Sequence, residues 1–336
     1  MTHVKWVFLF PIYNDNIVVL CLNIVSMERK VVFQTFALSK HYKNFKAVDE
    51  VNMTIYEGDI YGFVGENGAG KTTLIRLVCG LIQATSGDYS IFGASSQDSG
   101  IIEARRQTAA IVEAVALCRT LTALDNLKLH AKLVGVEKTN EEFNQILEDV
   151  GLETASIAKK KVGNFSLGMR QRLGIAIALL SDPKLLILDE PMNGLDPKGF
   201  IDIRETILRL NKKGVTFLIS SHILSELDKI CTRVGFLTHG RLVKEIDFDE
   251  LHQLARKKIV IRVKNSESIS KELAKQFNLK EVKLDGEFIT IYDTLDVNDV
   301  MKYLVDKKIK VESISSTEET IEDFYQQLIS GGANNG

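Results

Sequence analysis

Apolar and polar positions along the chain follow patterns that predict strands and helices in turn. Residues alternate as in half-exposed strands over Val31–Leu38 and Val48–Ile55. Runs typical of strands buried on both faces cover Asp59–Val64, Leu185–Leu188 and Val215–Ser220. Helices are predicted between these strands, at Thr72–Gly80, Ser166–Leu180 and Gly199–Leu210. This order predicts an α/β protein with a doubly wound sheet, whose ligands bind at the strand ends.

A middle segment, from about residue 94 to residue 182, has a different pattern and is predicted to be mostly helical. Apolar residues recur there at spacings of three and four, over Leu121–Val134 and Glu141–Val150. Thr139 and Glu142 form the pattern of a capping box, and Gly151 is placed to end the second helix.

Residues 256–330 form a separate C-terminal module in the sequence pattern. Strands and helices follow one another as β-α-β-β-α-β, and Asp285-Gly286 marks a hairpin between two of the strands. A final helix is expected at Glu318–Ile329, with Ser316 and Glu319 as its capping box. Residues 331–336 are rich in glycine and asparagine, and we expect them to be a disordered tail.

The first 26 residues do not fit the regular pattern. Two apolar runs there are interrupted by Asn14-Asp15-Asn16 and by Pro11, which makes a membrane-spanning helix costly. No small-residue cleavage site follows them, so a signal peptide is also disfavoured. We interpret residues 1–26 as an extension outside the fold, with Met27 as a more natural beginning. A membrane-surface anchor is the alternative.

Composition narrows the classes of protein. A chain of 336 residues with 45% apolar residues can bury a main domain and an appendage. Its formal net charge of −2 argues against a nucleic-acid-binding protein that uses a broad basic surface. The four cysteines are scattered and form no C-x-x-C pair, so neither a zinc site nor a disulfide framework is indicated.

The clearest chemical motif is GENGAGKTT, which has the spacing of a phosphate-binding P-loop. It lies between a predicted strand and a predicted helix, as such a loop requires. Its backbone N–H groups and the helix N-terminus form an anion cradle, while Lys71 can reach the β- and γ-phosphates and Thr72 can bind Mg²⁺. The expected phosphate-binding residues of this loop are Gly65, Glu66, Asn67, Gly68, Ala69, Gly70, Lys71, Thr72 and Thr73.

Further motifs give the chain a resemblance to a known family. LLILDE ends in Asp189-Glu190, FSLGMRQ contains Ser166 and Gly168, and NGLD ends at Asp196, followed later by ISSH with His222. In this order and spacing they resemble the Walker B motif, signature, D-loop and switch histidine of the nucleotide-binding subunit of an ABC transporter. The resemblance covers about Val31 to Ile246. It implies an ATPase domain at 31–250, with a P-loop core, an antiparallel β subdomain and a helical subdomain.

The resemblance also implies roles for individual residues. Asp189 and Thr72 would hold Mg²⁺, Glu190 would act as general base and His222 would contact the γ-phosphate. Tyr42 matches the aromatic residue that stacks on adenine, although alone it would more often be a surface residue. Ser166, Gly168 and Asp196 would face the nucleotide of a second subunit, so two chains would sandwich two ATP molecules.

Glu113 occupies the position that is usually the Q-loop glutamine, and would serve in catalysis and metal binding. Together with the SLGMRQR signature, it resembles the branch of exporters for peptide antibiotics such as bacitracin and lantibiotics. The alternative for Glu113 is a solvated acidic residue in a loop. The branch implies a separate membrane-spanning permease and a location at the cytoplasmic face of the membrane. The alternatives are a transporter for another cargo, or a soluble ABC ATPase that acts outside transport.

Overall fold

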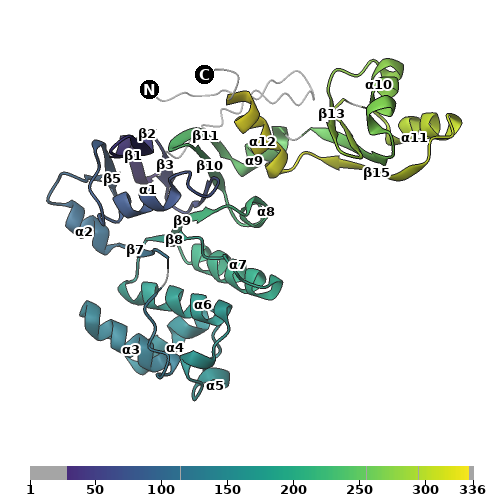
Figure 1. The fold of residues 1–336 in the computed structure, drawn as a ribbon. Helices are drawn as coiled ribbons and strands as arrows, with labels where there is room; N and C mark the ends of the chain where they lie inside the picture. Colours follow the sequence, from purple (N-terminus) through teal and green to yellow (C-terminus); the bar gives the residue numbers. More distant parts are fainter. Residues whose placement is uncertain (1–28, 114, 255, 294, 333–336) are drawn as a thin grey trace, which may run out of the picture.

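The computed structural model describes residues 29–113, 115–254, 256–293 and 295–332. The extension predicted at residues 1–26 therefore lies outside the described residues. Figure 1 shows three regions: a two-sheet core, a helical lobe below it, and a C-terminal module that projects to one side. The core is built from chain segments before and after the lobe.

A mostly parallel six-stranded sheet forms the centre of the core. Its order is β11-β10-β4-β9-β8-β7, with every neighbouring pair parallel except the hairpin of β10 and β11. This arrangement confirms the predicted α/β fold. The strands are β4 (Ile60–Val64), β7 (Thr108–Ile111), β8 (Leu185–Asp189), β9 (Thr216–Ser221), β10 (Arg233–Thr238) and β11 (Arg241–Asp247).

A second sheet is antiparallel and packs over the P-loop helix. It contains β1 (Val31–Tyr42), β2 (Phe45–Val51), β3 (Thr54–Tyr56), β5 (Ser86–Ile91) and β6 (Ala94–Ser95). The helices around the two sheets are α1 (Lys71–Val78), α2 (Ile101–Arg106), α7 (Pro197–Lys212), α8 (Leu224–Leu227) and α9 (Phe248–Leu254).

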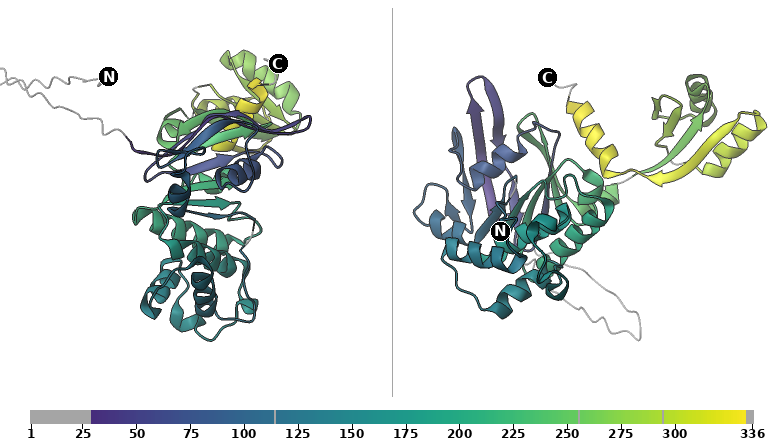
Figure 2. Two further views of the ribbon diagram at one scale, coloured as in Figure 1. Left: turned by 90° about the vertical axis from the view of Figure 1, so that its left-hand side faces the viewer. Right: turned by 60° about the horizontal axis from the view of Figure 1, so that its bottom comes forward.

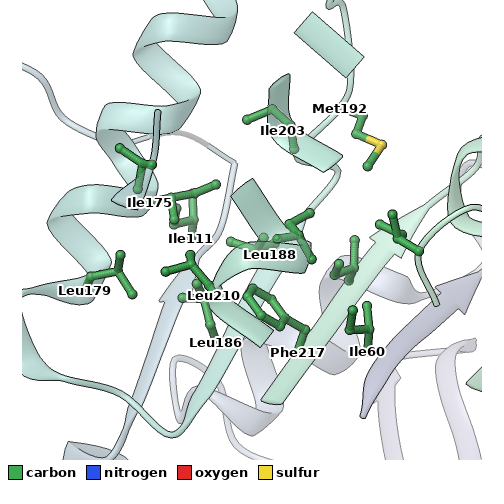
Figure 3. Close-up of a cluster of buried hydrophobic side chains, with 14 of the residues drawn as sticks. Ile60, Ile111, Ile175, Leu179, Leu186, Leu188, Met192, Ile203, Leu210 and Phe217 are labelled. Atoms are coloured by element: carbon green, nitrogen blue, oxygen red, sulfur yellow. The ribbon is translucent and has the colours of Figure 1, made fainter. Parts of the chain in front are cut away.

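The strands predicted from continuous apolar runs are buried on both faces, and each face packs into a different hydrophobic core. On β8, Leu185 and Ile187 point into the core beneath the antiparallel sheet, whereas Leu186 and Leu188 point to the other side. Figure 3 shows this second side, where Leu186, Leu188 and Phe217 meet residues of α6 and α7. Because both faces of the sheet are covered, the residues that point to one face and those that point to the other are both apolar.

The helical lobe begins later than predicted. It contains α3 (Ala123–Val134), α4 (Asn140–Asp149), α5 (Thr154–Ile157), η1 (Val162–Asn164), α6 (Leu167–Ala178) and η2 (Leu179–Ser181). The capping box of Thr139 and Glu142 is confirmed, and Gly151 follows α4 with a left-handed φ of 72°. However, β6 and β7 lie within the segment predicted as mostly helical. Thr108–Ile111 is short and rich in small residues, and only its pairing with β8 identifies it as a strand.

The C-terminal module has the predicted β-α-β-β-α-β order and a core of its own. Its elements are β12 (Lys257–Val263), α10 (Ser266–Phe277), β13 (Val282–Asp285), β14 (Phe288–Ile291), α11 (Val297–Asp306) and β15 (Val311–Glu318). The strands form one antiparallel sheet in the order β13-β14-β12-β15.

The final helix, α12 (Ile321–Gly332), differs from the prediction in three ways. Its capping box is formed by Thr320 and Asp323 rather than by Ser316 and Glu319, because Ser316 is paired in β15. It continues through two glycines that were expected in the tail. Finally, it packs into the core of the six-stranded sheet and away from the module with which it was grouped. Both views in Figure 2 show α12 beside the sheet.

Candidate functional site

The P-loop connects β4 to α1, and two of its glycines are required by close packing. Gly70 has φ 108°, and a Cβ there would lie 2.1 Å from the carbonyl oxygen of Ala47. A Cβ on Gly65 would lie 2.5 Å from the carbonyl oxygen of Leu237, which belongs to β10. The loop is therefore held between the antiparallel sheet and the six-stranded sheet, with room for backbone only.

Lys71, the first residue of α1, is 6% exposed and points back over the loop. Its Nζ donates to the carbonyl oxygen of Gly65 at 2.6 Å and to that of Glu66 at 3.2 Å. The same nitrogen lies 3.4 Å from Oε1 of Glu190. The ammonium group is thus placed at the centre of the loop, where incoming phosphates would meet it.

Asp189 and Thr72 contact each other across the end of the sheet. Asp189 is the last residue of β8 and is buried, and its Oδ2 accepts from the Thr72 hydroxyl at 2.9 Å. Its Oδ1 accepts from the Ser220 hydroxyl at 2.6 Å. The Ser220 side chain from β9 therefore fixes the orientation of the Asp189 carboxylate. The sequence analysis did not predict this role of Ser220.

Glu190 and His222 form a second pair beside Lys71. Oε2 of Glu190 lies 2.8 Å from Nδ1 of His222, which follows β9. Glu190 has a left-handed φ of 50°, and its amide donates to the Ser220 side chain at 2.9 Å. The turn after β8 thereby directs two successive carboxylates differently, Asp189 toward Thr72 and Glu190 toward Lys71 and His222.

A cavity of about 300 Å³ lies directly over these groups. It is lined by Phe45, Ala47, Asn67, Gly68, Gly70, Lys71, Thr72, Thr73 and Glu190. The lining combines the loop backbone, the ammonium group and an aromatic ring from the start of β2. The loop backbone and Lys71 could therefore bind the anionic part of a ligand, and the aromatic ring could stack on a flat apolar group attached to it.

The two aromatic residues of the β1–β2 hairpin differ in position. Phe45 is 61% exposed and lines the cavity, whereas Tyr42, its partner across the hairpin, is not part of the lining. The Tyr42 ring instead lies beneath the Lys40 ammonium group, 5.1 Å from Nζ. Sequence reasoning missed Phe45, because the register of the hairpin decides which ring faces the loop.

Glu113 lies outside this cluster in the structure. It follows β7 with a left-handed φ of 65°, is exposed, and forms an ion pair with Arg76 on the P-loop helix. It does not line the cavity. The two residues are 37 positions apart, so the pairing carries no local signal in the sequence.

Ser166, Gly168 and Asp196 lie together at the starts of α6 and α7, away from the cavity lining. Ser166 caps α6 by accepting from the Met169 amide, and Asp196 caps α7 by accepting from the Gly199 amide at 2.9 Å. A Cβ on Gly168 would lie 3.5 Å from Cα of Gly199, so the two helices approach closely there. Gly168 is buried where the helices meet, and the exposed Ser166 and Asp196 lie on either side of it, so the three residues bring the two helix N-termini to one surface.

The fold and the P-loop cluster together define a nucleotide-binding cassette, and comparison with known proteins agrees. The family described as ABC transporter matches residues 48–193. The chain is 42% identical to the bacitracin transport ATP-binding protein BcrA of Bacillus licheniformis, over 90% of this chain and 98% of that protein. It is 41% identical to the lantibiotic transport ATP-binding protein SrtF of Streptococcus pyogenes, over 63% of this chain and 89% of that protein.

Solved structures lead to the same fold. An ATP-binding subunit of an ABC transporter is 30% identical, with a TM-score of 0.56, and the match covers 66% of this chain and 92% of that one. The chain belongs to the ABC transporter family and is one of its ATP-binding, ATP-hydrolysing subunits. Within the described residues, no helix has both the length and the apolar character needed to cross a bilayer.

Proposed function

We propose that this chain powers an exporter for a peptide antibiotic or a similar membrane-active compound, using the cavity at the P-loop to bind ATP. The observation that supports the site is that Lys71, Thr72 and Glu190 line one cavity. Asp189 is bonded to Thr72 and His222 to Glu190 directly behind that lining. The loop backbone from Gly65 to Gly70 would receive the phosphates, and Thr73 would extend the cradle. The Phe45 ring, with Tyr42 beside it in the hairpin, would stack on adenine.

The residues present fit a magnesium ion. The Thr72 hydroxyl and the Asp189 carboxylate lie 2.9 Å apart and are oxygen donors of the kind that Mg²⁺ prefers. When bound, the ion would reduce the negative charge on the phosphates. Glu113, also expected as a ligand, is paired with Arg76 and would have to leave that pair to reach the site.

Glu190 is placed to act as general base in hydrolysis. Its carboxylate would accept a proton from the water that attacks the γ-phosphate, and the phosphate would leave the ADP oxygen in line with that attack. His222, 2.8 Å from Oε2, holds the carboxylate and would contact the γ-phosphate as well. Lys71 would offset the negative charge that is shared among the phosphate oxygens in the transition state.

A second copy of the chain would complete each site. The surface of Ser166, Gly168 and Asp196 offers helix N-termini, whose partial positive charge favours a phosphate on an opposing subunit. We therefore propose a homodimer that closes on two ATP molecules, bound to a separate membrane-spanning permease at the cytoplasmic face of the membrane. Support for the permease comes from the names of the relatives, which are ATP-binding proteins of transport systems.

The proposed cargo rests on the relatives and on Glu113. Two similar proteins are named for bacitracin transport and one for lantibiotic transport. The loop that contains Glu113 connects β7 to the helical lobe. In this place it would couple ATP hydrolysis to a movement of the permease.

The test compares survival against bacitracin and several lantibiotics in cells that carry the intact protein, Lys71→Ala or Glu113→Ala. We expect resistance from the intact protein, and its loss in both variants. Glu113→Gln is the matched control for charge. Equal sensitivity in all strains, with ATPase activity measured in the purified intact protein, would overturn the cargo and leave the ATPase assignment unaffected.

A further inference from the structure

The final helix, α12, contacts the nucleotide-binding core directly. Ile321 and Tyr325 are 4% and 6% exposed and belong to the core of the six-stranded sheet. The Tyr325 ring stacks on Phe236 of β10, with ring centres 5.7 Å apart and planes at 22°. Phe324 contacts the same ring from another direction. The helix is therefore anchored on β10 by aromatic packing.

Strand β10 supports the P-loop from outside. Phe236 pairs with Val64, the residue before the loop, and the Leu237 carbonyl fixes the path of Gly65. The turn after β10 continues this support, because the Gly240 amide donates to the Ala69 carbonyl at 3.0 Å. A helix that lies on β10 is thus one layer away from the phosphate cradle.

A small cavity separates Tyr325 from the loop. It measures about 100 Å³ and is lined by Glu66, Asn67, Gly68, Ala69, Leu237, Thr238, His239 and Tyr325. In the described part of the chain, the buried Tyr325 hydroxyl lies near the Thr238 hydroxyl and the Glu66 amide, but neither the Tyr325 nor the Thr238 oxygen makes a contact with the full geometry of a hydrogen bond. Each water molecule occupies roughly 30 Å³ in the liquid, so the cavity has room for a few. Two buried hydroxyls beside a loop backbone are the partners that such water needs.

The ionisation of Tyr325 is compatible with this arrangement. Burial raises the pKa of its phenol, while the Thr238 hydroxyl and the backbone amide of Glu66 lower it in part, and the net shift is upward. The phenol is therefore neutral at physiological pH and able both to donate and to accept a hydrogen bond.

We propose that Tyr325 is a positioning residue for the P-loop, bracing the backbone of Glu66–Ala69 through water in this cavity, so that α12 links the C-terminal module to nucleotide binding. The inference rests on the proposed nucleotide site at this loop. Phosphates that order the loop would strengthen its contacts with Tyr325, and by linkage a docked α12 would strengthen nucleotide binding by the same factor.

Ion pairs join α12 to the base of the module. The guanidinium group of Arg256, next to β12, donates twice to the Glu319 carboxylate ahead of α12, from Nε to Oε2 at 3.0 Å and from Nη2 to Oε1 at 2.8 Å. Lys258 of β12 pairs with Asp323 in the first turn of α12. A displacement of the module would therefore pull on the start of α12, within about one turn of Tyr325.

The experiment measures the Kd for a fluorescent ATP analogue with Mg²⁺ in the full chain. The Tyr325→Phe variant removes only the phenolic hydroxyl, and the Thr238→Val variant removes the second buried hydroxyl that faces the cavity. We expect each to raise the Kd about five-fold, the effect of one hydrogen bond, with a smaller than additive effect in the double variant. Tyr303→Phe is the matched control, because this tyrosine packs against Phe277 within the module.

A second measurement tests the reciprocal effect. In the intact protein, the ATP analogue should slow amide hydrogen exchange of α12, and Tyr325→Phe should abolish that change. An unchanged Kd in Tyr325→Phe, or an equal change in Tyr303→Phe, would overturn the role of Tyr325. Lys71→Ala tests the nucleotide site separately, since undiminished binding in that variant would overturn the proposed function instead.

Discussion

Replacing Glu190 by glutamine should abolish ATP turnover and at the same time tighten ATP binding. The amide keeps the shape of the side chain and can keep the contact with Nδ1 of His222, now 2.8 Å. It cannot accept a proton from water. Loss of a general base lowers rates by about 10²–10⁴-fold, so we expect phosphate release to fall by at least a hundred-fold.

The expected gain in binding follows from Lys71. Its Nζ lies 3.4 Å from the Glu190 carboxylate, and both side chains are largely buried. With an effective dielectric constant near 20, this attraction is worth about 5 kcal/mol before solvation is counted. ATP must compete with this pair and also bear the repulsion between the carboxylate and its phosphates. The Glu190→Gln substitution would remove both costs.

The assays are phosphate release with MgATP and equilibrium binding of a fluorescent ATP analogue, with size-exclusion chromatography to follow an ATP-dependent dimer. Glu190→Gln should give a lower Kd, negligible turnover and a dimer that persists. The matched control is Glu226→Gln, on the short helix after His222 and outside the cavity lining. Turnover at the rate of the unmodified protein would refute the catalytic role, and weaker ATP binding would refute the argument from Lys71.

Three further outcomes are expected. Phe45→Ala should raise the Kd for ATP about three- to ten-fold through lost stacking, and a larger effect of Tyr42→Ala would contradict this. Burial raises the pKa of Asp323, but hydrogen bonds from Lys258 and Thr320 outweigh it and leave the pKa below 3.8. The contribution of the ionised Asp323 to folding stability is therefore present at neutral pH and should be lost as pH falls below about 4. The loss should appear as a change in near-ultraviolet circular dichroism that is absent in Asp323→Asn. Deleting residues 1–26 should leave the melting temperature and ATPase rate unchanged, and a fall in either would contradict the interpretation as an extension.

Features fixed by neighbouring residues were predicted well from the sequence. The strand, glycine-rich turn and helix around Lys71 carry their own signals, and so does the capping box of Thr139 and Glu142. Ser316 and Glu319 had the same spacing, yet distant partners decided their structure. Ser316 pairs with Ile259 in the module sheet, and Glu319 binds Arg256. The capping-box pattern considers only residues three positions apart, so it cannot predict either of these long-range contacts.

The candidate site shows the same division. Motifs identify the ends of β8 and β9, so Asp189, Glu190 and His222 could be placed near Lys71 from the sequence. Which aromatic ring faces the loop depends on the register of the β1–β2 hairpin, and the partner of Glu113 depends on where α1 packs on the sheet. Packing between distant segments decides both. The position of α12 beside the loop was missed for this reason, since the rest of the cassette and the whole C-terminal module separate Tyr325 from Glu66 in the sequence.

The contacts at the P-loop also predict how the site depends on metal. One ammonium group, Lys71, lies beside the Glu190 carboxylate, and a second carboxylate, Asp189, is bonded to the neighbouring Thr72, so these three charged groups together carry a net negative charge. ATP without a cation would bring several more negative charges into a largely buried space. Chelating Mg²⁺ with EDTA should therefore raise the Kd of the ATP analogue by about ten-fold or more. Asp189→Asn should shrink this difference, because its amide attracts a cation less and repels phosphate less. An equal Kd with and without Mg²⁺ would show that Thr72 and Asp189 do not hold the ion. A large metal effect that survives Asp189→Asn would place the ion elsewhere.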